Sequence, residues 1–228
     1  MDHVSLTDAA GVAVLAIDRP PANAIDIDLL DSIVGAVNRL AADSPRALVV
    51  TGRQGFFSAG VDLKTVPSYG PAEHRRMVEG INAMALGVYG LMCPVIGAIT
   101  GHAIAGGLVL ALCTDLRVAS ANGRYGLTEI KVGVAYPQAA IGVVRAELSP
   151  HAARLLALGS QLVDAAECLR LGVFDEVVEP DATLPRALEL ARELASYPSD
   201  TYARTKRDLR GETLAGLRAA AAGDPLLA

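Results

Sequence analysis

The chain has 228 residues, a length that fits one or two domains. Hydrophobic residues make up 52% of it and charged residues 20%, so the chain can bury a large core. Its net charge of −5 argues against nucleic-acid binding, which relies on clustered Lys and Arg. No uninterrupted run of about 18 apolar residues is present, so we expect neither a nucleic-acid partner nor a membrane span.

The cysteines and histidines predict no metal site. Cys93, Cys113 and Cys168 are widely spaced and form no CxxC pair, and the four histidines lack metal-ligand spacing. Cys93 and Cys113 lie in apolar runs, which favours buried thiols in a reducing compartment. Because the N-terminus has no basic stretch followed by an apolar one, we expect no signal peptide and a cytoplasmic location.

Hydrophobic periodicity in the first half alternates between strands and helices. We expect strands over 12–17, 47–51 and 95–99, and shorter ones over 116–119 and 124–127. Helical spacing covers 27–40, with Asp26 or Asp28 as N-cap, and 71–92, and a short apolar helix covers 108–113. This order predicts an α/β fold with βαβ connections.

The second half is mainly helical. Ser149 is a candidate N-cap before Pro150, and Asp164 begins a capping box with Gly172 beyond the helix end. We expect a strand over 173–178 and helices over 185–194 and 199–209, the last closed by Gly211, then a weak helix over 213–222. The chain therefore divides softly into a core, residues 1–148, and a helical region, residues 149–228.

Two glycine-containing loops are candidates for close backbone contact with a ligand. The first, 56–64, follows a buried strand, and the second contains Ala105, Gly106 and Gly107 just before an apolar helix. Glycine allows close backbone approach, and the start of a helix offers unpaired N–H groups with positive potential. Such a loop can hold an anion or a developing oxyanion, although an ordinary turn or a packing glycine remains the alternative.

An ordered set of short motifs resembles the crotonase (enoyl-CoA hydratase/isomerase) superfamily. The motifs run in sequence as Asn23-Ala24-Ile25, Phe57-Ser58-Ala59-Gly60-Val61-Asp62-Leu63, Gly101-His102-Ala103-Ile104-Ala105-Gly106-Gly107, Cys113-Thr114-Asp115 and 171–178. The resemblance implies the crotonase (ClpP-like) fold, in which ββα repeats form two roughly perpendicular sheets. It also implies a helical C-terminal region used for oligomerisation and assembly as a homotrimer or a dimer of trimers.

The resemblance further implies an acyl-CoA thioester substrate, with coenzyme A entering as part of the substrate and no separate cofactor. By motif position, the backbone N–H groups of Val61 and Gly106 form the oxyanion hole, where one donor is worth roughly 3–4 kcal/mol of barrier. The CoA- and substrate-binding candidates are Ala22, Ala24, Ile25, Ala59, Gly60, Val61, Asp62, Leu63, Lys64, Gly106 and Val109. Lys64, Arg204 and Lys206 are candidates for the CoA phosphates.

Two departures from the hydratase pattern bear on the reaction. Hydratases of this superfamily use two glutamates, and Val109 stands at the first of these positions while Glu129 fills the second. Valine cannot activate water. Pro137 falls at or beside a glycine whose N–H binds the catalytic water, and proline has no N–H to give.

A single carboxylate is enough to move one proton, so the pattern is similar to that of Δ3,Δ2-enoyl-CoA isomerases, with Glu129 as the base. An apolar acyl pocket, which Val66, Met77, Ile81, Met84, Leu108 and Val109 could line, would raise the pKa of Glu129. Hydration, hydrolysis or decarboxylation on the same scaffold stays open, because fold does not decide function. A non-catalytic acyl-CoA binder is a third reading.

Overall fold

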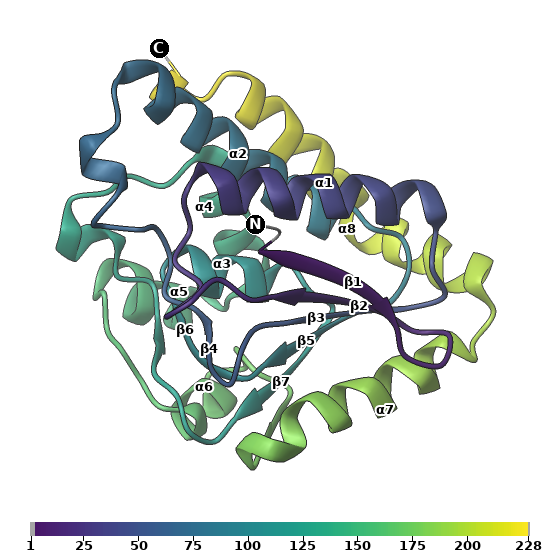
Figure 1. The fold of residues 1–228 in the computed structure, drawn as a ribbon. Coiled ribbons are helices and arrows are strands. Elements are labelled where there is room, and N and C mark those ends of the chain that lie inside the picture. The colour runs from purple at the N-terminus through teal and green to yellow at the C-terminus, as the bar shows by residue number, and fades with distance from the viewer. Residues whose placement is uncertain (1–2, 228) are drawn as a thin grey trace.

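The computed structural model describes residues 3–227 and contains two sheets flanked by helices (Figure 1). The larger sheet has the strand order β1-β2-β3-β5-β7-β9. Only the edge strand β1 runs antiparallel to its neighbour. The bounds are β1 Val4–Asp8, β2 Ala13–Ile17, β3 Leu48–Thr51, β5 Val95–Ile99, β7 Leu116–Ser120 and β9 Glu176–Val178.

The smaller sheet is parallel and has the order β4-β6-β8. Its strands β4 (Gly55–Ser58), β6 (Gly101–Ile104) and β8 (Tyr125–Gly126) each follow a strand of the larger sheet within a few residues. The helices α2 (Pro71–Tyr89), α3 (Gly106–Leu112) and α4 (Gln138–Glu147) then complete three successive ββα units. The predicted α/β class with ββα repeats is therefore confirmed.

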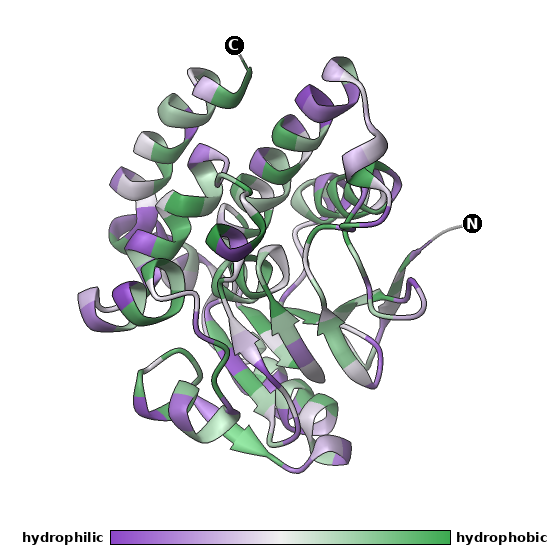
Figure 2. Cartoon of the chain, turned by 90° about the vertical axis from the view of Figure 1, so that its left-hand side faces the viewer, coloured by the Kyte–Doolittle hydropathy of each residue, from purple (hydrophilic) through white to green (hydrophobic). Residues whose placement is uncertain are grey.

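Helices cover both faces of the larger sheet, which is why its inner strands β2, β3 and β5 are almost entirely apolar. α1 (Ile27–Asp43) packs beside α2 on one face, and α7 (Thr183–Ala195) lies on the other (Figure 1). Val49 of β3 and Ile96 of β5 pack toward α7. The residues on either side of Val49, Leu48 and Val50, belong to the main core. In Figure 2 hydrophobic residues follow these inner faces and hydrophilic residues the outer helix turns.

The remaining α-helices follow β8, whereas the short turn η1 lies between β4 and α2. They are α5 Pro150–Ala153, the continuing wider turn η3 Arg154–Leu158, α6 Ala165–Arg170 and α8 Ser199–Ala222, with short turns η1 Val66–Ser68, η2 Glu129–Val132, η4 Pro180–Ala182 and η5 Pro225–Leu227. Within residues 3–227, no helix is both long and apolar enough to cross a membrane.

Three predicted helix N-caps are confirmed, whereas α3 and α7 each begin two residues earlier than predicted. The Asp26 side chain accepts a hydrogen bond from the Leu29 N–H and is the N-cap of α1. Ser149 caps α5, and Asp164 caps α6 through the Glu167 N–H. Gly172 lies beyond the end of α6 with φ +71°, the conformation expected of a glycine there.

The prediction of two C-terminal helices separated at Gly211 is wrong, because α8 is continuous from Ser199 to Ala222. Tertiary contacts outweigh the low helix propensity of one glycine. Lys206 and Arg210 hold Asp115 before Gly211, and Leu214 and Leu217 enter the core after it.

The segments before and after residue 149 share a sheet and a core. β9 pairs with β7, and Leu217 of α8 belongs to the same hydrophobic cluster as Leu15 of β2. The predicted strand over 173–178 is shorter than expected, because residues 173 to 175 form the connection after α6 and only Glu176–Val178 join the sheet. The division into a core and an oligomerisation region stays a prediction.

Candidate active site

A cavity of about 430 Å³ lies between α2, α3 and the segment from Glu129 to Ala140. Its walls are mainly apolar and include Val61, Val66, Met77, Ile81, Val109 and Pro137. An apolar pocket with a few polar groups is the usual form of a small-molecule site.

Two residues that line this cavity have backbone amides without acceptors among residues 3–227. On either side of Val61, the Ile25 N–H donates to the Gly60 carbonyl at 2.7 Å and the Asp62 N–H to the Ile25 carbonyl at 2.8 Å. This pairing leaves the Val61 N–H itself unused, and Gly106, the first residue of α3, likewise donates to no acceptor within residues 3–227. Both residues line the cavity, as an oxyanion hole requires.

Glycines allow the two amide-bearing loops to approach each other. Gly60 has φ +78°, and a Cβ there would lie 2.7 Å from the Ile104 carbonyl oxygen and 2.8 Å from the Ala105 Cβ. A Cβ on Gly107 would lie 2.3 Å from the Ser58 carbonyl oxygen. Ala105 itself has φ +52°, an uncommon conformation for a residue with a side chain, just before the Gly106 amide. The backbone is thus held in a costly geometry at the place where the amides face the cavity.

Glu129 begins η2 and lines the cavity, and only 6% of the residue is exposed. The Tyr136 hydroxyl donates a hydrogen bond to Glu129 Oε2 at 2.6 Å. Burial raises the pKa of Glu129, and the hydrogen bond from Tyr136 opposes that shift without cancelling it. A carboxylate with a raised pKa is a stronger base, so Glu129 is suited to accept a proton from carbon.

Val109 and Pro137 both line the cavity with Glu129. Val109 is 1% exposed and lies on α3, the helix that begins at Gly106. Among the described lining residues, Glu129 is the single carboxylate, and the other ionisable side chains are His74 and Tyr136. Sequence reasoning missed Tyr136, His74 and Leu226 as lining residues, since nothing in their local pattern marks them.

The loops expected to bind CoA lie side by side. The Ala59 N–H donates to the Ala22 carbonyl at 3.0 Å, which adds to the Ile25 pairing. Arg19 binds both Asp26 and Asp62 and donates to the Ala24 carbonyl, so it fastens the two loops together.

The individual CoA candidates differ in what they can contact. Leu63 lines the cavity, and Lys64 next to it is exposed. The Asp62 carboxylate accepts hydrogen bonds from the Lys64 and Thr65 N–H groups and from Arg19, which outweigh burial and lower its pKa. Asp62 therefore shapes the loop, and Ile25, 1% exposed, supports it from inside.

Some candidates from the sequence do not reach the site. The prediction that Lys206 binds a phosphate is wrong, because its buried ammonium donates to the Cys93 carbonyl and to Asp115. Arg204 is exposed on α8 and lies 3.9 Å from Asp208. Met84 and Leu108 are fully buried core residues and do not line the cavity.

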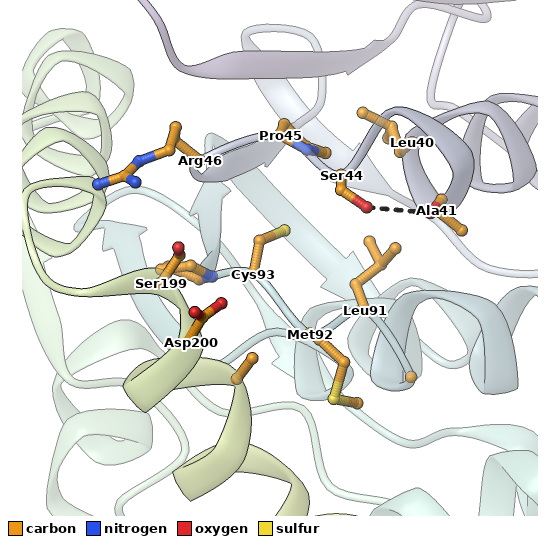
Figure 3. A pocket seen from close by; sticks show the side chains of 13 residues that line it. Leu40, Ala41, Ser44, Pro45, Arg46, Leu91, Met92, Cys93, Ser199 and Asp200 are labelled. Atoms are coloured by element: carbon orange, nitrogen blue, oxygen red, sulfur yellow. Dashed lines mark hydrogen bonds between the residues drawn. The ribbon is translucent and has the colours of Figure 1, made fainter.

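A second cavity, of about 400 Å³, lies where α1 ends and α8 begins (Figure 3). Arg46, Cys93 and Asp200 lie around it, and Arg46 donates to the backbone carbonyls of Ala195 and Tyr197. It contains neither Glu129 nor the two free amides, so the first cavity is the candidate active site.

Comparisons with known proteins show which family the chain belongs to. The family model of enoyl-CoA hydratase/isomerase matches residues 7–224. A probable enoyl-CoA hydratase of Mycobacterium bovis is 32% identical over 202 residues, covering 86% of this chain and 76% of that protein. The mitochondrial enoyl-CoA delta isomerase 1 of Mus musculus is 33% identical over 215 residues, covering 90% and 72%.

A crystal structure of a probable enoyl-CoA hydratase from Mycobacterium tuberculosis has a TM-score of 0.91 and 31% identity, covering 97% of this chain and 94% of that one. Relatives described as hydratases and as isomerases thus lie at similar distances. With its ββα units and paired amides, the chain belongs to the enoyl-CoA hydratase/isomerase family of the crotonase superfamily.

Proposed function

We propose that this protein is a Δ3,Δ2-enoyl-CoA isomerase, in which Glu129 moves one proton and the Val61 and Gly106 amides hold the thioester oxygen. The observation that carries the proposal is the cavity's composition, with Glu129 as the single carboxylate among its described lining residues. An acyl-CoA thioester is a substrate consistent with the family.

The reaction needs only these groups. Glu129 takes a proton from C2 of a 3-enoyl thioester, and the electron pair of that C–H bond moves toward the thioester carbonyl. The resulting dienolate carries its negative charge on oxygen, where the two amides stabilise it. The protonated Glu129 then returns the proton to C4, the double bond comes to lie between C2 and C3, and the carbonyl is restored with no net change in charge.

Hydration is less well supported by this cavity. Water addition in the family's hydratases uses a second glutamate, and the side chain at that place is Val109, which is buried and apolar. Pro137, also at the cavity, has no N–H to orient a water. Both residues leave proton abstraction by Glu129 unaffected.

Three further proposals concern the cofactor, the assembly and the location of the protein. No cofactor is needed beyond the coenzyme A of the substrate, because the proton and electron pair both stay within substrate and Glu129. We propose the homotrimer or dimer of trimers typical of the family and a cytoplasmic location. Light scattering of the purified protein tests the assembly.

The decisive experiment compares two substrates. Purified protein should convert 3-hexenoyl-CoA to trans-2-hexenoyl-CoA and hydrate crotonyl-CoA poorly. Glu129→Gln should reduce isomerisation by about 10²- to 10⁴-fold, the usual contribution of a general base. Glu212→Gln, on the exposed face of α8, is the matched control and should keep full activity.

Each alternative reading has its own outcome. Vigorous hydration of crotonyl-CoA would refute the inference that Val109 and Pro137 disfavour water addition. Normal isomerisation by Glu129→Gln would remove Glu129 as the base. Tight CoA binding without turnover on enoyl-, acyl- or malonyl-type thioesters would instead favour a non-catalytic binder.

A further inference from the structure

Glu129 has a partner that its proposed role as a base does not require. Tyr136 lines the same cavity, lies seven residues along the chain, and donates its hydroxyl hydrogen to Glu129 Oε2 at 2.6 Å. A hydrogen bond to an ionised acceptor is among the stronger ones in proteins. No side-chain hydrogen bond to the other oxygen, Oε1, is present within residues 3–227.

The loop between the two residues fixes this contact. η2 ends at Gly133 with φ +69°, a left-handed conformation that glycine adopts without strain. The Val134 N–H then donates to the Glu129 carbonyl at 3.0 Å and closes the turn, so the chain returns to the base at Tyr136. Pro137 follows at once and precedes α4, which anchors the far side of the loop. Tyr136 is therefore held in place by its own backbone.

We infer that Tyr136 is a positioning residue for the proposed isomerase reaction, because it holds Oε2 of Glu129 and leaves Oε1 as the oxygen that exchanges the proton. This inference rests on the proposed function. One oxygen then both removes the proton from C2 and returns it to C4. The phenol stays protonated throughout and takes no part in bond making.

The same contact favours the ionised form of a buried base. Burial raises the pKa of Glu129, and the Tyr136 hydroxyl stabilises the carboxylate and works in the opposite direction. Burial and the nearby carboxylate also raise the pKa of Tyr136, so the phenol remains a donor. Losing the hydroxyl should therefore leave Glu129 protonated in a larger share of the enzyme at neutral pH.

Other charged groups near Glu129 are few. His74 from α2 reaches the cavity, and its ring lies 3.1 Å from the Gly70 carbonyl. Lys131 on η2, Arg154 on η3 and Lys64 on the neighbouring loop are exposed, while α3 contributes no charged residue and α4 contributes Ala140 to the cavity. Since an imidazole can change charge between about pH 5 and 8, His74→Gln serves as a control for the pH profile.

The test is the pH dependence of kcat/KM for 3-hexenoyl-CoA in Tyr136→Phe. The acid limb should move upward by about one pH unit, because a hydrogen bond to a charged group has been removed. On the acid limb of the profile kcat should fall several-fold with KM little changed, since phenylalanine keeps the cavity wall. Tyr89→Phe is the matched control. The Tyr89 hydroxyl likewise donates to a carboxylate, that of Glu147 at 2.9 Å, but Tyr89 does not line the cavity.

A readout without turnover separates the two proposals. In protein with ¹³C-labelled glutamate carboxyls, the Glu129 resonance is the one missing from Glu129→Gln, and it should titrate at higher pH in Tyr136→Phe. A shift no larger than that in Tyr89→Phe overturns the role of Tyr136, even where Glu129→Gln is inactive. If Tyr136→Phe does not fold, 3-fluorotyrosine can replace Tyr136 instead. Its hydroxyl is a stronger donor, so the Glu129 carboxyl should titrate at lower pH. An unchanged Glu129 titration would overturn the role of Tyr136 equally.

Discussion

Replacing Gly60 by alanine tests whether the backbone amides act as the oxyanion hole. The new Cβ would lie 2.7 Å from the Ile104 carbonyl oxygen and 2.8 Å from the Ala105 Cβ, both of which are backbone-fixed. Neither atom is the end of a flexible side chain, so the loop itself must move. The loops carrying Val61 and Gly106 would then separate, since Gly60 precedes Val61 on the first loop and packs directly against Ile104 and Ala105 of the second.

Two contributions determine the magnitude. A left-handed alanine costs about 1–2 kcal/mol of stability, and the steric clash adds to it. Displacing one amide from the oxyanion position should reduce kcat by about 10²- to 10³-fold, or roughly 3–4 kcal/mol of barrier. The effect on activity should therefore be larger than the effect on stability.

The assay measures isomerisation of 3-hexenoyl-CoA alongside urea unfolding. Gly11→Ala is the matched control, because Gly11 has φ +85° but open space around its Cβ position. If Gly60→Ala folds and works within fivefold of Gly11→Ala, the argument from loop approach is refuted.

Other perturbations test the base and the framework. Below about pH 4 Glu129→Gln and wild type should unfold at similar urea concentrations, but at pH 7 the variant should be more stable. The carboxyl has a raised pKa in the folded state, so wild type loses stability as pH rises through it. For the same reason wild-type kcat/KM should fall as pH drops through that pKa, and a flat profile from pH 4 to 8 would contradict it. Lys206→Met should lower the free energy of unfolding in urea by about 3 kcal/mol and leave activity at 15 °C unchanged. This is the lower end for a broken buried ion pair, because Arg210 still neutralises Asp115. Asn23→Ala should lower the free energy of unfolding by at least about 2 kcal/mol, because the Asn23 side-chain amide donates hydrogen bonds to the carbonyls of Ile17, Phe56 and Phe57. An unchanged melting temperature would contradict this.

Local signals predicted the elements whose stability is local. The helix over 27–40 became α1, and the strand over 95–99 matches β5 residue for residue, because the apolar spacing of each reflects one buried face or a fully buried strand. The caps at Asp26, Ser149 and Asp164 depend on contacts three residues apart, which a sequence displays directly.

Elements held by distant contacts were not predictable in the same way. β1 (Val4–Asp8) exists through its ladder with β2, and its own pattern alternates only weakly. α8 passes through Gly211 because Asp115, nearly a hundred residues earlier, binds Lys206 and Arg210 on its first half. The partners of these segments lie too far along the chain for any local period to report them.

The two parts of the candidate site, its amides and its base, differ in the same way in how well the sequence predicts them. Its amides are set by glycine sterics, at Gly60 and Gly107, and glycines in a loop can be read from a sequence. Its base depends on side chains from separate turns, since Tyr136 reaches Glu129 only after the chain reverses at Gly133. In the proposed reaction, holding the oxyanion therefore depends on the backbone, whereas proton transfer in place of water addition depends on the side chains around Glu129. Exchanging those side chains, with Val109→Glu as the first step, should change the reaction without moving the amides.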